Sequence, residues 1–492
     1  MKLIALFLIL LFPTVHSCQS QIESEVEKWD IFELTLKGPS KGNPFTEVEL
    51  SATLTNGGEK ENIKGFYDGD GVYKIRFMPS KEGTWNYKTQ SNRSALKGKK
   101  GKFKCTAPST NNKGLVQVAE NYHFSYANGE SYYPVGTTLY CWELENYDET
   151  LQSLKGTGYN KVRYMPFPHK NNKLPIKPFK GENHNWDFSR PNPEFWKMIE
   201  QSVADLGELG IQADFILFHP YDRKEFGLDK MTADERKFYL EYVVARLSAY
   251  QNVWWSMVNE YDLIDKTVEY WDTLGLIVAE ADPYNHLLSV HGLPGSKYDW
   301  NKDWVTHVSY QISRDVEELT DLHTFKSQYN KPVILDEYGY EGDIGAYWGK
   351  LSGEEEVFRH WSATIQGAYA THGESYGNEL YFWKGGTPVG ESFDRVSWLA
   401  NEIYQNHEKP IPSGLTNISK NGAKAGDTYY LYYYGKTSAT SKTFDLPKGS
   451  SFLVDVIDTW EMSIEEKGIY TGRVTIEIPA KQYIAIRVFK TE

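Results

Sequence analysis

The alternation of apolar and polar residues divides the chain into three stretches. Residues 28–108 contain short alternating runs such as FELTLKG and VYKIRFM, separated by Gly-, Pro- and Asn-rich turns. A period of two is typical of strands with one buried face. The pattern predicts a small, immunoglobulin-like β-sandwich at the N-terminal end. Similar runs within 409–492, such as FLVDVIDTW and VTIEIP, predict a second β-sandwich at the C-terminal end.

Between these stretches, residues 109–408 alternate apolar strand-like runs with helical patterns. Asn192 followed by Pro193 indicates a helix start, and Thr232 with Glu235 forms a capping-box pattern. Strands alternating with helices predict a parallel sheet, and eight such runs predict an α/β fold, the (β/α)8 TIM barrel. A short interval after the fifth run predicts that one helix is missing there. The predicted strands are 132–140, 160–167, 211–218, 252–259, 286–292, 304–312, 331–337 and 378–383.

The N-terminus carries the apolar run LIALFLILLF followed by PTVHSC, which ends at Cys18. A run of about ten apolar residues suits a signal peptide, because a spanning helix needs roughly 20. The segment before Cys18 resembles the bacterial lipoprotein cleavage box, although His16 is an unusual occupant. We therefore expect a signal peptide over 1–17, acylation of Cys18, secretion across the inner membrane, and a periplasmic or cell-surface lipid anchor. Plain secretion with an incidental Cys18 is the alternative.

Composition and charge narrow the function classes. The formal charge of −13 is spread along the chain, which argues against binding nucleic acid through its phosphates. Aromatic residues make up 15% of the chain, and their flat rings suit the apolar faces of sugars as well as protein cores. Apart from Cys18, only Cys105 and Cys141 are cysteines, so a disulfide-stapled fold is excluded and the pairing of these two is left open.

The usual motifs of metal, cofactor and nucleophilic-serine chemistry are missing from the sequence. The histidines are scattered without the HExxH spacing, and CxxC, GxSxG and phosphate-binding loops do not occur. We therefore predict no metal site and no cofactor.

Two glutamates end predicted barrel strands. Glu260 ends the run NVWWSMVNE, and Glu337 ends the run KPVILDE. TIM barrels place their active sites at the carboxyl ends of the strands. Two carboxylates that face one cleft are what glycoside cleavage requires, because one protonates the leaving oxygen while the other attacks or stabilises the sugar. The pair predicts an O-glycosyl hydrolase acting on a carbohydrate.

Four motifs carry a family resemblance. They are GFYDGDGVYKIRFMP, WWSMVNEYD, ILDEYGYEG and THGESYGNELYFWKGG. In their order and spacing the chain resembles the apiosidase-like group of bacterial polysaccharide-degrading hydrolases, within the larger clan of retaining (β/α)8 glycosidases. The resemblance covers essentially the whole mature chain. It implies a retaining, double-displacement glycosidase with β-sandwiches on both sides of the barrel.

The resemblance also implies roles for five residues. Glu260 would be the general acid/base, kept protonated by burial and the paired carboxylate, and Glu337 the nucleophile. Asn259 would bond a substrate hydroxyl beside the reacting carbon. Arg163 would hold the nucleophile ionised, and Trp383 would form the apolar floor of the subsite.

Further substrate-binding candidates follow other predicted strands. Because a strand has a period of two, only one of Tyr310 and Gln311 can face inward, and the sequence leaves the choice open. The candidates are Trp142, His219, Tyr221, Asp222, His291, Tyr310, Gln311 and Glu374.

Two other functions compete with the enzyme. One is a catalytically inactive carbohydrate-binding lipoprotein, in which the barrel keeps its shape without turnover. The other is a protein-binding module, based on the two β-sandwiches. The presence of both Glu260 and Glu337 favours the enzyme.

Overall fold

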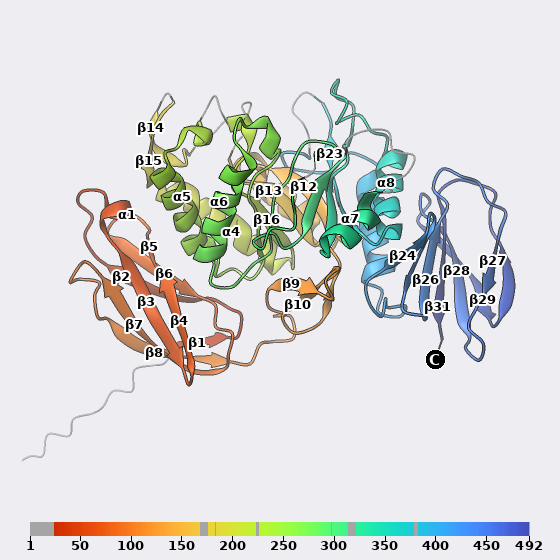
Figure 1. Cartoon of the computed structure of the whole chain (residues 1–492), viewed down its shortest axis with the longest axis horizontal. Helices are drawn as coiled ribbons and strands as arrows, with labels where there is room; N and C mark the ends of the chain where they lie inside the picture. The colour runs from red at the N-terminus through yellow and green to blue at the C-terminus, as the bar shows by residue number, and fades with distance from the viewer. Residues whose placement is uncertain are drawn as a thin grey trace, which may run out of the picture.

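A computed structural model describes residues 24–167, 176–182, 184–222, 226–296, 298–312, 321–377 and 382–491, without the side chains of Asp222 and Asp321 (Figure 1). A central barrel lies between two β-sandwiches, which confirms the predicted fold class. The signal peptide and Cys18 lie outside the described residues, so cleavage and acylation stay predictions. The domain boundaries at 108 and 408 also stay predictions. Within the described part of the chain, no helix is both long and apolar enough to cross a membrane.

The N-terminal sandwich packs a five-stranded sheet on a three-stranded one. Their inner faces bury Trp85, Tyr73 and Phe32, which stacks on Phe103 with ring centroids 3.9 Å apart. The first sheet holds, in order, β1 (Ser24–Glu27), β8 (Lys100–Thr106), β7 (Gly83–Ser91), β3 (Leu50–Asn56) and β4 (Glu59–Lys64). The second holds β2 (Phe32–Lys37), β6 (Val72–Phe77) and β5 (Phe66–Tyr67), and α1 (Pro44–Glu47) lies between β2 and β3 in the chain.

Eight parallel strands form the barrel. Between β18 and β19 no ladder is formed, but Thr306 N donates to Leu288 O (2.8 Å) and Ser289 Oγ to His307 O (2.6 Å), which nearly close it. These strands are buried on both faces, as expected for a parallel sheet covered by helices. The order is β18 (Leu288–Ser289), β17 (Val253–Ser256), β16 (Gln212–Ile216), β13 (Lys161–Met165), β12 (Val135–Tyr140), β22 (Tyr369–His372), β20 (Val333–Glu337) and β19 (Val308–Gln311).

Helices cover the outside of the barrel (Figure 1). The Asn192 side chain accepts from Glu194 N (3.1 Å), and Thr232 and Glu235 form a complete capping box, so both predicted helix starts are confirmed. No helix occurs among the described residues between β18 and β19, in agreement with the predicted missing helix. The helices are α2 (Trp142–Glu145), α3 (Tyr147–Leu154), α4 (Pro193–Glu208), α5 (Ala233–Leu247), α6 (Val268–Ala281), α7 (Asp321–Tyr329), α8 (Gly353–Ile365) and α9 (Ser392–Leu399). Shorter turns are η1 (Pro220–Asp222), η2 (Leu228–Lys230), η3 (Tyr261–Leu263) and the π-helical η4 (Ala400–Tyr404).

The eighth barrel strand is β22, so the prediction of a strand at 378–383 was wrong. Residues 378–381 lie outside the described residues, and Phe382 and Trp383 enter a turn closed by a bridge to Gly385. The run at β22 is short and contains Thr371, whose hydroxyl donates to Asp336 inside the barrel (3.0 Å). A polar inner face weakens the hydrophobic signal on which the prediction relied.

Small sheets and the C-terminal sandwich complete the fold. The three strands β9 (Val116–Ala119), β10 (His123–Tyr126) and β11 (Ser131–Tyr132) lie at one end of the barrel, and β23 lies at the other (Figure 1). Two short pairs are β14 (Phe179–Glu182) with β15 (Asn185–Pro191), and β21 (Glu341–Gly342) with β23 (Glu374–Ser375). The sandwich holds β24 (Thr416–Ser419), β25 (Gly422–Ala425), β26 (Tyr429–Tyr433), β31 (Ile484–Lys490), β28 (Phe452–Asp458) and β29 (Ser463–Tyr470) in one sheet and β27 (Ser441–Asp445) with β30 (Arg473–Glu477) in the other.

A buried ion cluster joins the N-terminal sandwich to the barrel. Arg76 of β6 donates to both Glu200 oxygens of α4 (2.7 and 3.0 Å). Arg246 of α5 donates to the same carboxylate (2.6 Å) and to Asp68 (2.8 Å). All four side chains are buried, with two arginines for two carboxylates. We call this set the interface cluster.

The two cysteines of the described chain are both free and buried. Cys105 lies in the core of the N-terminal sandwich, whereas Cys141 packs beside Met165 and Trp383 at the barrel. The pairing that the sequence left open is therefore not formed.

Candidate functional site

Glu260 lies just beyond the carboxyl end of β17. Its backbone is left-handed, with φ of +50°, an uncommon conformation that non-glycine residues adopt at a cost and that clusters at functional sites. The Tyr221 hydroxyl donates to Glu260 Oε2, and Gln311 Nε2 donates to Oε1 (3.2 Å). The side chain is almost buried, with 7% of its surface exposed. Two polar side chains thus fix the direction of this carboxylate.

Glu337 is the last residue of β20, on the far side of the barrel sheet from β17. Arg163 Nη1 donates to Glu337 Oε2 (3.0 Å) and also to the Tyr140 hydroxyl. Burial raises the pKa of the Glu337 carboxyl to about 7; Arg163 opposes this rise and the Glu260 carboxylate adds to it. One guanidinium therefore does not compensate fully for the burial of this group.

Two routes of polar contacts connect the glutamates. In the first, His291 Nε2 lies 2.9 Å from Gln311 Oε1 and 3.7 Å from Glu337 Oε2, while Gln311 donates to Glu260. Burial, reinforced by Arg163, lowers the pKa of His291 well below its usual range, so this imidazole is neutral. The first route thus connects Glu260 and Glu337 across the carboxyl end of the barrel.

The second route runs through Asn259. Arg163 Nη2 donates to Asn259 Oδ1, and Asn259 Nδ2 lies 3.4 Å from the Tyr221 hydroxyl. Because Tyr221 accepts from Asn259, its own proton points to Glu260. Arg163, at the centre of β13, thereby reaches both glutamates, directly on one side and through two side chains on the other.

Aromatic side chains line one side of this pair. Trp383 meets Tyr140 edge-on with ring centroids 4.8 Å apart, and Trp348 lies 6.4 Å from Trp383. Tyr140 N donates to Trp383 O (2.7 Å), which holds the turn of Trp383 against the end of β12. Trp383 therefore lies beside the Tyr140–Arg163 contact, although it does not belong to a barrel strand.

The structure separates the two candidates on β19. Gln311 faces Glu260, whereas Tyr310 packs between Trp300 and Phe325 on the side of α7. The ladder between β19 and β20 shifts register between Tyr310 and Gln311, which aligns Gln311 with Glu337. Tyr310 therefore lies away from the glutamates.

Three further residues were predicted to bind substrate. Trp142 is completely buried and stacks on Tyr147 (5.1 Å between centroids), so it belongs to the core and not to the site. His219 Nδ1 accepts from Tyr221 N (3.2 Å) and supports the turn that carries Tyr221. The side chain of Asp222 lies outside the described residues.

Two tyrosines of the site were missed in the sequence. Tyr140 accepts from Arg163, and Tyr340 packs in the same buried cluster as Tyr140 and Trp383. Tyr140 is the last residue of the first predicted strand, which is the position where barrel enzymes place functional side chains. Tyr340 lies in the motif ILDEYGYEG and could have been identified there.

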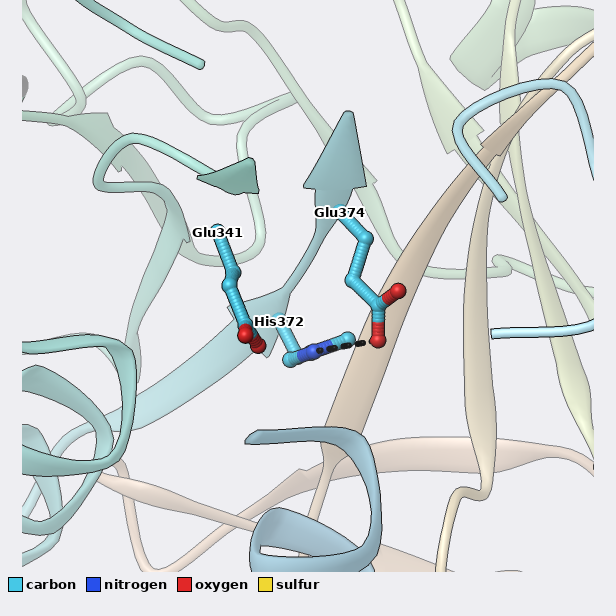
Figure 2. Close-up of side chains that lie close together, drawn as sticks. All are labelled: Glu341, His372 and Glu374. Carbon is cyan, nitrogen blue, oxygen red and sulfur yellow. Dashed lines mark ion pairs between the residues drawn. The ribbon is translucent and has the colours of Figure 1, made fainter. Parts of the chain in front are cut away.

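Glu374 lies in a second buried cluster, with Glu341 and His372 (Figure 2). One nitrogen or oxygen atom from each of the three lies within 4.8 Å of the others. The sequence predicted no metal site because these residues lack a recognisable spacing. The three side chains come together only because β21 and β23 pair beyond the ends of β20 and β22.

Comparisons with known proteins agree with this architecture. The family model described as "Apiosidase-like, catalytic domain" matches residues 119–401. Two domain families of unknown function, DUF5060 and DUF5605, match residues 25–92 and 419–489. No curated protein matches the chain.

Solved structures extend the comparison. A "putative glycoside hydrolase from Bacteroides vulgatus ATCC 8482" is 37% identical, with a TM-score of 0.89 over 95% of this chain and 100% of that one. A family 5 glycoside hydrolase from the same organism is 16% identical, with a TM-score of 0.58 over 77% of this chain and 94% of that one, and shows the fold alone. Because the apiosidase-like model matches more than half of the chain, the chain belongs to the apiosidase-like family of glycoside hydrolases and acts on carbohydrate.

Proposed function

We propose that this glycosidase cleaves oligosaccharide or polysaccharide linkages with retention of configuration, by double displacement between Glu260 and Glu337. The observation that carries the proposal is the pair of glutamates at the ends of β17 and β20, joined through Gln311 and His291. A retaining enzyme needs its two carboxyl groups about 5 Å apart, with one proton between them. The Glu260 carboxylate contributes to the raised pKa of Glu337, which supports a narrow gap.

In the first step, Glu260 protonates the glycosidic oxygen while the Glu337 carboxylate attacks the anomeric carbon. The bond from that carbon to the leaving oxygen breaks, and a glycosyl ester forms on Glu337. In the second step, Glu260 takes a proton from water, the water oxygen attacks the same carbon, and Glu337 leaves as a carboxylate. Trp383 supplies an apolar face for the attacked sugar.

The positions of the charges support this division of roles in part. Arg163 donates to Glu337, as a nucleophile requires. However, Glu260 accepts from Tyr221 and Gln311, and the pKa of Glu337 is raised. The proton must therefore reside on Glu260 once sugar is bound. The reverse assignment, with Glu337 as the acid, is the alternative that the experiment must separate.

The test compares Glu260→Ala on two kinds of substrate. Loss of the acid should reduce kcat/KM for natural linkages by roughly 10²–10⁴-fold, and much less for aryl glycosides whose leaving group needs no proton. The exposed Glu269 of α6 provides the control Glu269→Ala, which should resemble wild type. Equal losses on both substrates would contradict the acid/base role. A product of inverted anomeric configuration, followed by NMR, would contradict double displacement.

A catalytically inactive carbohydrate-binding lipoprotein is the second candidate. Its distinguishing result would be sugar binding that survives in wild type, in Glu260→Ala and in Glu337→Gln, with no hydrolysis by any of the three. The strained backbone of Glu260 and its two fixed hydrogen bonds favour the enzyme, because a binding protein has no need to orient this carboxylate.

A further inference from the structure

The cluster of Glu341, His372 and Glu374 is completely enclosed. Their side chains come from β21, the end of β22 and the start of β23, and relative exposures are 2%, 0% and 0%. In Figure 2 both carboxylates point toward the imidazole ring of His372. None of the three contacts Glu260 or Glu337 through an ion pair or hydrogen bond of the described residues, so the cluster is separate from the pair at the barrel mouth.

One oxygen of the cluster has no hydrogen-bond donor within the described structure. Glu374 Oε2 accepts from Val389 N and Gly390 N, both at 2.9 Å, but Oε1 is buried without a partner. It lies 3.8 Å from His372 Nε2, which is the contact drawn in Figure 2. A buried oxygen of this kind is costly unless something positive or a proton donor faces it.

Some buried carboxylates of the described chain have a cation beside them, whereas Glu143 has none within ion-pair distance. Lys161 lies 2.6 Å from Asp336, and Arg487 Nη2 lies 2.6 Å from Asp455. Across the described ranges, no lysine or arginine lies within ion-pair distance of Glu341 or Glu374. Two buried carboxylates therefore face one imidazole without a balancing charge.

We propose that a divalent transition-metal ion of the zinc type binds here, with His372 Nε2, Glu374 Oε1 and one oxygen of Glu341 as its ligands. One imidazole nitrogen and two carboxylate oxygens form a donor set that such ions accept. Bonds of about 2.0–2.2 Å place ligand atoms roughly 3.5 Å apart. Ligand atoms that lie up to 4.8 Å apart reach that spacing when each moves by roughly 0.7 Å.

Ser392 is the fourth donor. Its hydroxyl now lies 3.0 Å from His372 Nε2 and donates to Glu341 Oε2 (2.5 Å), so it occupies the space between two of the ligands. An ion at this place replaces those two hydrogen bonds and takes the hydroxyl oxygen into its own coordination. The other nitrogen, His372 Nδ1, lies 3.1 Å from Thr137 Oγ1, and this contact orients the ring.

The ion is structural, because the cluster is closed to solvent. Glu341 follows Glu337 by four residues, and its oxygens accept from Glu391 N (2.8 Å) and Ser392 N (2.9 Å). The ion would therefore tie the segment after β20 to the segment that follows Trp383. Its removal should loosen both segments and leave the barrel folded.

Metal content of the full-length protein provides the first test. After dialysis against zinc and then against buffer, elemental analysis should find about one zinc per chain, and EDTA should remove it. We expect zinc to raise the apparent Tm of EDTA-treated protein by roughly 3–8 °C. A zinc content far below one per chain together with an unchanged Tm would overturn the proposal.

Variants locate the ion within the chain. Glu374→Gln and His372→Gln should each lose the bound zinc and the shift in Tm, whereas Glu143→Gln, at a buried carboxyl elsewhere, should keep both. Zinc retained at one per chain by both cluster variants would place the ion elsewhere and refute this site. Should either variant fail to fold, Ser392→Ala replaces it, with a weaker but measurable loss of zinc affinity as the expected result.

Discussion

The interface cluster and the glutamate pair are both buried and charged, but only one of them is balanced. In the interface cluster, Arg76 and Arg246 face Glu200 and Asp68. At the barrel mouth, Arg163 is the one arginine or lysine of the described chain within ion-pair distance of Glu260 or Glu337. Full pairing stabilises a fixed contact between domains, whereas partial pairing leaves a proton that can move during a reaction.

The largest expected effect is on kcat, when Glu337 of the partly paired glutamates is replaced. Glu337→Gln keeps the size of the side chain and its contact with Arg163 but removes the carboxylate that we propose as the nucleophile. We expect kcat to fall by on the order of 10⁴-fold or more, with the fold retained. Steady-state kinetics on a cleaved substrate, with circular dichroism as the check on folding, measures this. Activity within about tenfold of wild type would remove Glu337 from the mechanism.

The balanced cluster should respond in the opposite way. Arg246→Met leaves Asp68 without its arginine and Glu200 with one fewer. Breaking a buried pair costs about 3–5 kcal/mol, so the apparent free energy of unfolding should fall by this amount while kcat stays near wild type. Urea unfolding and kinetics on the same preparation test both halves. A large loss of kcat without destabilisation would show that the comparison between the clusters is mistaken.

The pH dependence of stability should separate the clusters further. Because the pKa of Glu337 is raised to about 7 in the folded chain, the folded state keeps a proton that the unfolded state releases between about pH 4.5 and 7. Stability contributed by this group therefore falls as pH rises. The stability of Glu337→Gln relative to wild type should increase by up to about 3 kcal/mol from pH 4.5 to pH 8.

A carboxylate with a lowered pKa supplies the control for that slope. A backbone hydrogen bond from Ser109 lowers the pKa of the partly exposed Glu27, so its stabilising contribution is present at neutral pH and lost as pH falls. The relative stability of Glu27→Gln should therefore decrease slightly from acid to neutral pH. Unfolding curves recorded across the pH range give the free energy of unfolding of each variant relative to wild type. A difference between Glu337→Gln and wild type that does not change with pH would contradict the raised pKa.

Much of the site followed from one rule about the sequence. Residues that end parallel strands gather at one end of a barrel, and this rule identified Glu260 and Glu337 and brought Gln311 into consideration. It misled at Trp142, because Cys141 adopts a positive φ of 58° and turns the chain into α2, which directs the tryptophan into the core. The backbone conformation of one residue, Cys141, thus determines that Trp142 faces the core and not the site.

The parts that escaped prediction depend on contacts between distant segments. The interface cluster combines residues from three elements and the loop after β5, between positions 68 and 246, and no short spacing links them. β22 was missed because Thr371 bonds to the buried Asp336–Lys161 pair, which replaces apolar packing inside the barrel. Polar interiors of this kind are stabilised by partners that become visible only when the chain is folded.

Tyr221 offers the smallest and most specific change at the mouth. Its hydroxyl donates to Glu260 and stabilises the ionised carboxylate, so Tyr221→Phe removes one fixed hydrogen bond without changing the ring. A hydrogen bond to a charged group is worth about 1.5–3 kcal/mol, and we expect a fall in kcat of roughly 10- to 150-fold, with KM nearly unchanged. Because the pair of glutamates then holds its proton more tightly, the alkaline limb of the kcat profile should move to higher pH.

His219, which accepts from Tyr221 N, gives the comparison. His219→Asn should lower kcat by loosening the turn but leave the alkaline limb in place. If both variants lower kcat equally and neither moves the limb, Tyr221 acts only through the shape of its turn and not through its proton.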